Sequence, residues 1–232
     1  MLPVRFKQED DLGHTSVLGA MLFWLPLAGL VSAGGSVLVY LLLAKLGWLG
    51  AVVAALVYPM LYGFLHTEAV ADVADALYAA HSGKDAYSIV KDPTVGAMGV
   101  LWTVAVVLLK TALIVYLLMH GAWALFVAAA ISSRMGLEML FFTQIFRSSF
   151  ILTLQRGFDS KLFGGSMVLF LLVGLAVTGA RFFLIAALAM GISYLVATRI
   201  GKKLGFLNGD VLGTTLEATE IVLMLGGALL WL

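Results

Sequence analysis

The stretch Met98-Gly-Val-Leu-Trp-Thr-Val-Ala-Val-Val-Leu-Leu-Lys-Thr-Ala-Leu-Ile-Val-Tyr-Leu-Leu-Met119 contains one charged residue, Lys110. A helix of about 20 apolar residues is long enough to cross the hydrocarbon core of a bilayer, so this run predicts a membrane span. The composition agrees, with 62% apolar and 12% charged residues and a mean hydropathy of +1.06. Soluble domains average about half apolar and about a quarter charged residues, so the chain belongs to the membrane class.

Further apolar segments flank this one, and we expect an all-α polytopic bundle of about seven spans. The predicted segments are Val17–Leu46, Trp48–Leu65, Met98–Met119, Ala122–Phe142, Leu162–Thr178, Phe182–Thr198 and Val211–Leu232. The first is the longest and contains Pro26 and Gly34-Gly35, so we expect a kink or a strong tilt in it. No internal repeat divides the chain, and residues 1–232 are treated as a single membrane domain.

The connections between the segments predict their orientation. Three long polar connections, residues 66–97, 143–161 and 199–210, lie on one side with the N-terminus if every segment spans once. That side carries ten of the basic residues outside the spans: Arg5, Lys7, Lys84, Lys91, Arg147, Arg156, Lys161, Arg199, Lys202 and Lys203. The other side carries only Lys45 and Arg181. The positive-inside rule places the N-terminus and the long connections in the cytoplasm, as for a protein of the bacterial cytoplasmic (inner) membrane.

The composition also limits the partners and the chemistry. The chain has no cysteine, which excludes disulfides, zinc–thiolate sites and thiol nucleophiles. A net charge of +1 does not indicate a nucleic-acid partner, so the expected partners are the lipid bilayer and small molecules. The sequence leaves open whether the chain forms a homo-oligomer.

An acidic cluster follows the second segment in His66-Thr-Glu-Ala-Val-Ala-Asp-Val-Ala-Asp-Ala76. Its acids Glu68, Asp72 and Asp75 are spaced i, i+4, i+7, so on a helix they point within roughly 60° of one another. Adjacent like charges are unfavourable unless a cation lies between them, and Mg²⁺ prefers oxygen ligands. We therefore predict a metal site here. The alternative is a solvated acidic helix face, although such a face more often mixes Lys with Glu.

Two further stretches carry candidate site residues. Ser88-Ile-Val-Lys-Asp-Pro-Thr-Val-Gly-Ala-Met-Gly99 offers Lys91 as a phosphate partner and Asp92 as another carboxylate, although the same pattern also marks ordinary helix entry. In the last segment Asp210 could be only an N-cap. Glu217 and Glu220 lie two to three turns into an apolar helix, where a carboxylate is costly and usually functional.

Basic residues inside the spans complete the set. Lys110 lies too deep for its amine to reach the membrane surface easily, which favours a functional role. Arg134 and Glu138 are spaced i, i+4 in the fourth segment. A buried ion pair between them and a role of Arg134 in substrate binding are equally consistent with this spacing.

These stretches together resemble the motifs of cobalamin synthases (adenosylcobinamide-GDP ribazoletransferases), in the same order along nearly the whole chain. The residues that carry the resemblance are His66–Ala76, Lys91–Gly99, Ile131-Ser-Ser-Arg134, Lys110, Pro26 with Gly29, and Gly209-Asp-Val-Leu-Gly-Thr-Thr-Leu-Glu-Ala-Thr-Glu220. The chain departs from the family pattern at Glu68, where Asp is usual, and at Ala69 and Ala76, where glycines are usual. We expect an adjusted metal geometry, not an inactive site.

The resemblance implies an enzyme that joins adenosylcobinamide-GDP to α-ribazole (or its 5′-phosphate) and releases GMP, with Mg²⁺ as the metal. The implied metal ligands are Glu68, Asp72, Asp75 and Asp92. The implied catalytic residues are Asp72, Asp75, Asp210 and Glu217, the last two as candidates to orient or deprotonate ribazole. The implied substrate-binding residues are His66, Lys91, Gly96, Gly99, Lys110, Arg134, Gly209 and Glu220. Two alternatives remain open: a membrane phosphotransferase of the CDP-alcohol type, and a cation transporter with intramembrane carboxylates.

Overall fold

The computed structural model describes residues 15–92 and 94–231, and it contains α-helices and no strand in these ranges. The all-α prediction is therefore confirmed. Leu2-Pro-Val4, Arg5, Lys7, Pro93 and Leu232 lie outside the described residues. The helices are α1 (Thr15–Phe23), α2 (Leu25–Leu42), α3 (Trp48–Leu61), α4 (Leu65–His81), α5 (Ala86–Val90), α6 (Ala97–Met119), α7 (Trp123–Thr143), α8 (Ser149–Gly157), α9 (Ser160–Thr178), α10 (Arg181–Leu204) and α11 (Gly209–Trp231), with a 3₁₀ turn at Ala44–Leu46.

The number of spans agrees with the prediction. Six helices, α2, α6, α7, α9, α10 and α11, are long and apolar enough to cross a membrane, and the bent pair α3–α4 can supply a seventh span. Helix α10 continues to Leu204, about two turns past the predicted end at Thr198. The polar residues Arg199, Lys202 and Lys203 therefore extend a helix instead of forming a loop.

The first predicted span is divided in two by a break at Trp24. Pro26 follows directly in the first turn of α2, where its missing N–H is not needed for helix hydrogen bonds. The irregularity expected in this segment is therefore a helix break at Trp24, two residues before Pro26, whereas Gly34 and Gly35 lie inside an unbroken helix. Helix α1, with only 9 residues, packs against α8 and α9 and does not span by itself.

The second predicted span, Trp48–Leu65, ends early, at Leu61, and the chain turns by 77° into α4. Gly63 and Phe64 both have positive φ (64° and 57°), which ends the helix and redirects it. The first half of the expected connection 66–97 is thus the helix α4, which packs between α6 and α11. The turn brings the acidic residues of α4 back against the bundle.

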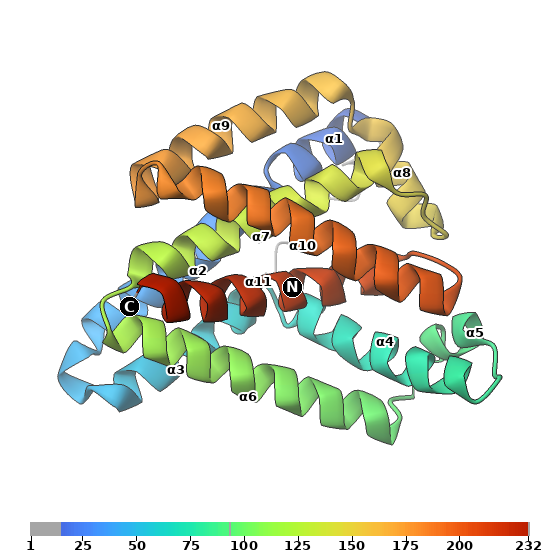
Figure 1. Cartoon of the computed structure of the whole chain (residues 1–232), viewed down its shortest axis with the longest axis horizontal. Helices are drawn as coiled ribbons and strands as arrows, with labels where there is room; N and C mark the ends of the chain where they lie inside the picture. The colour runs from blue at the N-terminus through green and yellow to red at the C-terminus, as the bar shows by residue number, and fades with distance from the viewer. Residues whose placement is uncertain (1–14, 93, 232) are drawn as a thin grey trace, which may run out of the picture.

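The short joints lie at one end of the bundle and the long connections at the other (Figure 1). The α2–α3, α6–α7 and α9–α10 joints are at the left in this view, as is the end of α11. Helices α5 and α8 and the α10–α11 connection are at the right. This arrangement agrees with the predicted grouping of connections.

Helix α7 is the centre of the bundle. Of its apolar stretch 89% is buried, against 17–28% for α2, α6, α9 and α10. Small residues allow this close packing, as at Gly136, where an added Cβ would lie 2.4 Å from the Ser193 hydroxyl of α10. The other spans keep broad apolar faces on the outside, which suits a lipid environment.

A pair of glycines in α2 tests this packing. A Cβ added to Gly29 would lie 2.2 Å from the backbone oxygen of Ala130 in α7, whereas one added to Gly34 has no atom within 4 Å. Gly29→Ala should lower the free energy of unfolding by about 1–3 kcal/mol through overpacking. Gly34→Ala should be neutral or stabilising, because alanine favours helix. Thermal unfolding in detergent measures both, and equal melting temperatures for the two variants would contradict the proposed α2–α7 contact.

Candidate active site

The carboxylates of α4 meet the start of α11. Asp72 is half-buried and lies close enough to Asp210, Glu68 and Asp75 for each to repel its charge. Glu68 also acts on Asp210 in the same way. Two acidic motifs more than 130 residues apart in the sequence therefore form one negatively charged patch, Glu68, Asp72, Asp75 and Asp210, which we call the acidic patch.

Asp210 is not the cap of α11. The side-chain oxygen of Asn208 accepts a hydrogen bond from the backbone N–H of Val211 at 3.1 Å, so Asn208 fills that role. The Asn208 amide also donates to Asp210 Oδ2 at 2.6 Å, and Gly209 opens the helix. The N-cap alternative for Asp210 is thus wrong. Asn208 was missed in the sequence, although Asn directly before an apolar helix is a known capping signal.

Asp75 is held by the glycine-containing stretch at the start of α6. Its carboxylate accepts hydrogen bonds from the backbone N–H groups of Gly96 and Gly99, both at 2.7 Å. An added Cβ would lie 2.6 Å from Asp75 Oδ1 at Gly96 and 2.4 Å from Oδ2 at Gly99. Glycine is needed at both positions because the backbone approaches the carboxylate this closely. The two motifs therefore fold around each other, and the predicted role of Gly96 and Gly99 in substrate binding stays a prediction.

Lys91 and Asp92 lie on the surface beside this contact. Asp92 Oδ1 accepts hydrogen bonds from the hydroxyl and the backbone N–H of Thr94 (2.6 and 2.9 Å), which lower the pKa of Asp92 below its usual value. The carboxylate is thus negatively charged at neutral pH and below. The amine of Lys91 lies 4.4 Å from the centre of the Tyr87 ring. Both side chains are exposed and accessible to a ligand.

Deeper in the bundle, two cations and two carboxylates form what we call the charge network: Lys110 of α6, Arg134 of α7, and Glu217 and Glu220 of α11. Lys110 Nζ lies 2.6 Å from Glu217 Oε2 and 2.6 Å from Glu220 Oε2. Arg134 pairs with Glu220. All four are at most 4% exposed. Paired charges are required here because an isolated buried charge is strongly unfavourable.

Hydroxyl groups from neighbouring helices complete the charge network. Tyr58 donates to Glu220 at 2.6 Å, and Tyr62 and Thr67 donate to Glu217 at 3.0 and 3.1 Å. Ser133 donates to Glu220 at 3.2 Å. None of these four hydroxyl groups was predicted to belong to the site, although Thr67 and Ser133 lie within the motif stretches His66–Ala76 and Ile131–Arg134. His66, predicted to bind substrate, lies against the Tyr62 ring with 5.3 Å between ring centres.

The predicted alternative of an Arg134–Glu138 ion pair is wrong. Arg134 pairs with Glu220, and Glu138 accepts a hydrogen bond from the Ser166 hydroxyl of α9 at 2.9 Å. Helix α7 is surrounded by other helices, so its two charged side chains find partners on different neighbours. Contact of Lys110 and Arg134 with a substrate phosphate stays a prediction, and in this structure Glu217 and Glu220 engage both cations.

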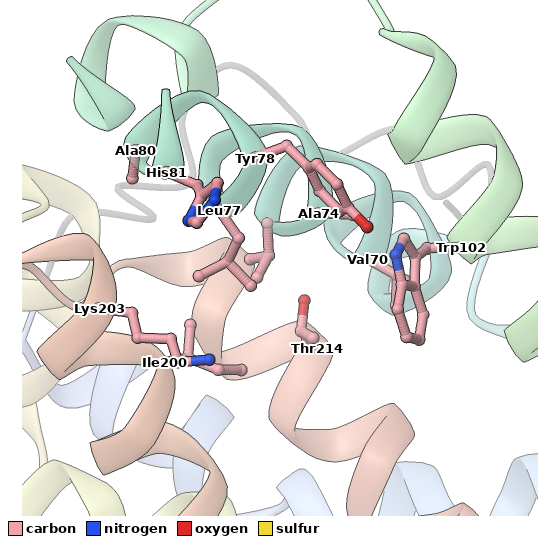
Figure 2. Close-up of a pocket in the computed structure, with 11 residues that line it drawn as sticks. Val70, Ala74, Leu77, Tyr78, Ala80, His81, Trp102, Ile200, Lys203 and Thr214 are labelled. Atoms are coloured by element: carbon pink, nitrogen blue, oxygen red, sulfur yellow. The ribbon is translucent and has the colours of Figure 1, made fainter. Parts of the chain in front are cut away.

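A large groove runs along α4, the helix that carries Glu68, Asp72 and Asp75 (Figure 2). It has a volume of about 720 Å³ and lies between α4, α6, α10 and α11. Thr214 on its floor is one helical turn from Asp210, and its hydroxyl donates to the backbone oxygen of Ala69 at 3.0 Å. A second, more polar pocket of about 340 Å³ is lined by Asp75, Asp92 and Lys84, and Tyr78 lines both. A bound molecule could therefore extend from the groove to the carboxylates.

The charge network predicts a large effect of removing Lys110. Lys110→Met would leave Glu217 without a cationic partner and Glu220 with Arg134 as its only cation, which should cost about 3–5 kcal/mol of stability. Adding Glu217→Gln restores the charge balance and should recover part of that loss. A double-mutant cycle of thermal unfolding in detergent measures the coupling. Wild-type stability of the Lys110→Met variant would contradict the network.

Comparison with known proteins agrees with the motifs. The sequence model of the cobalamin-5-phosphate synthase family matches residues 1–228. An adenosylcobinamide-GDP ribazoletransferase of Chlorobium chlorochromatii is 30% identical, covering 99% of this chain and 92% of that protein. One of Clostridium perfringens is 32% identical, covering 87% and 84%. No solved structure matches the chain. The chain therefore belongs to the cobalamin-5-phosphate synthase family, and it is a multi-pass membrane enzyme that joins cobinamide-GDP with ribazole in cobalamin biosynthesis.

Proposed function

We propose that the chain catalyses the Mg²⁺-dependent reaction of adenosylcobinamide-GDP with α-ribazole, or with its 5′-phosphate. A ribose hydroxyl oxygen forms a bond to the cobinamide phosphorus, and the phosphoanhydride bond to GMP breaks. The hydroxyl proton leaves, and the products are adenosylcobalamin (or its 5′-phosphate) and GMP. The observation that carries this proposal is the meeting of Glu68, Asp72 and Asp75 with Asp210 in one patch.

The acidic patch has the donor chemistry that Mg²⁺ requires. Its oxygens repel one another, and a divalent cation relieves that repulsion. Among residues 15–92 and 94–231, no three His, Asp or Glu side chains converge closely enough to hold a metal by themselves. This fits Mg²⁺, which is usually bound by one or two carboxylates together with substrate phosphates. When bound, Mg²⁺ would neutralise the negative charge that develops on the departing GMP.

The carboxylates of the site have different proposed roles in metal binding and proton transfer. Glu68 and Asp72 are the metal ligands we favour, because the carboxylate of Asp75 already accepts two backbone hydrogen bonds. Those bonds make Asp75 a link that positions the start of α6, and a role in metal binding remains part of the proposal. We favour Asp210 over Glu217 as the carboxylate that orients or deprotonates the ribose hydroxyl. Glu217 is 1% exposed and paired with Lys110, whereas Asp210 is accessible at the patch.

The membrane position follows from the same geometry. We propose that the acidic patch faces the cytoplasm across the bacterial inner membrane, because the basic connections lie at its end of the bundle. The groove between α4 and α10 then opens at the membrane surface. The family membership gives the two alternatives, a CDP-alcohol phosphotransferase and a cation transporter, no support, and no feature of the described residues favours either.

A reconstitution tests the proposal. Purified protein with adenosylcobinamide-GDP, α-ribazole and Mg²⁺ should yield a cobalamin product and one GMP for each, both measured by liquid chromatography. Chelation of the metal should abolish turnover, and added Mg²⁺ should restore it. Ion flux from proteoliposomes without GMP release would contradict the proposed reaction.

Variants of the acidic patch should lose turnover while remaining folded. We expect about a 100-fold loss or more for Asp210→Asn, because the amide cannot accept a proton. The same direction is expected for Asp72→Asn through weaker metal binding. Asp159→Asn at the start of α9 is the matched control, because Asn caps a helix as well as Asp does. Full activity of an Asp72→Asn/Asp75→Asn double variant would refute the assignment.

A further inference from the structure

The groove in Figure 2 is aromatic on one side and carries a positively charged amine on the other. Trp102 of α6 lies on one side of it and Lys203 of α10 on the opposite side, with Ala74 and Leu77 of α4 along one wall. Tyr78 and Trp102 are 48% and 51% exposed, so large aromatic surface is available next to the groove. The amine of Lys203 points toward the middle of the groove.

These features indicate which chemical group of the two substrates fits the groove best. The apolar walls offer few hydrogen-bond partners, so a group with many polar edges would lose its water contacts without replacement. Guanine and the amide-fringed corrin ring carry many such edges. The fused aromatic base of ribazole carries few, and flat aromatic surfaces stack favourably on Trp and Tyr.

The groove also leads to the proposed reaction centre. Thr214 lies one helical turn from Asp210, and Tyr78 lines both the groove and the polar pocket that contains Asp75. A base lying between Trp102 and α4 would place its attached ribose toward these carboxylates. Lys203, across the groove from Trp102, is the lining residue whose ammonium group can attract a phosphate on that ribose.

We propose that this groove binds the fused aromatic base of ribazole, with Trp102 and Tyr78 as its aromatic contacts and Lys203 as the partner of the 5′-phosphate. The inference rests on the proposed function, since it assigns a site to one substrate of that reaction. It makes Lys203 the residue that distinguishes ribazole from its 5′-phosphate, because only the second carries the anion that an ammonium group attracts.

The experiment measures KM for both ribazole forms at saturating adenosylcobinamide-GDP, and equilibrium dialysis of each form without that substrate. Trp102→Ala should weaken binding of both forms about tenfold through lost stacking. Trp102→Phe should restore most of it. Lys203→Gln should weaken binding of the 5′-phosphate about tenfold and leave ribazole unchanged. Lys202→Gln, one residue away and outside the groove, is the matched control, as is Trp48→Ala at the opposite end of the bundle.

The outcomes separate the two proposals. If the wild-type protein binds ribazole more tightly than Trp102→Ala does but forms no GMP, the proposed function fails and the groove assignment stands. If the wild-type protein turns over and Trp102→Ala binds both forms as tightly as wild type, the groove assignment fails and the enzyme assignment stands. Equal effects of Lys203→Gln on both forms, or equal effects of Lys202→Gln and Lys203→Gln, would also overturn it. In those cases the groove is a lipid-filled surface.

Discussion

The structure depends on balancing four charges inside an apolar bundle. Lys110, Arg134, Glu217 and Glu220 come from three helices, and none can remain without a partner at their depth. Their pairing joins α6, α7 and α11 at one level. Tyr58 and Tyr62 of the α3 segment add hydrogen bonds to the same carboxylates. Charge pairing restricts the relative positions of these helices more than apolar packing does, because apolar side chains can pack in several registers.

The register set by the charge network decides where the start of α11 lies. Glu217 is two turns beyond Asp210 on that helix, so pairing of Glu217 with Lys110 determines the position of Asp210. Thr67 of α4 donates to the same Glu217 carboxylate, and this contact brings the first turn of α4 beside α11. The acidic patch is therefore assembled by contacts made several ångströms deeper in the bundle. A buried network of this kind can give specificity to a site without itself contacting substrate.

The acidic patch differs, because its like charges form no salt bridge with a basic side chain among residues 15–92 and 94–231. Asp75 is stabilised by two backbone N–H groups of the glycine stretch, but Asp72 faces three other carboxylates. Repulsion of this kind is unfavourable unless a ligand offsets it, and the Mg²⁺ that we propose, together with substrate phosphates, would do so. The charge network is therefore balanced within the protein, whereas the acidic patch lacks such a balance, which is why we propose a ligand for the patch.

Much of the architecture was readable from the sequence, because long apolar runs have few folding options in a membrane. The number of spans, the break near Pro26 and the position of the long connections at one end of the bundle were predicted correctly, and so was the helical spacing of Glu68, Asp72 and Asp75. The resemblance of the motifs to a family was confirmed by comparison. The turn at Gly63-Phe64 was not predicted, since neither residue breaks a helix reliably by itself.

By itself the sequence determined which residues are charged in an apolar chain, and therefore which ones need a partner or a ligand. Only the tertiary structure decided the partners. Arg134 lies four residues from Glu138 but pairs with Glu220, and Asn208, not Asp210, caps the last helix. The physical reason is that helical spacing specifies the side of a helix, whereas the identity of the neighbour on that side depends on how all the helices pack.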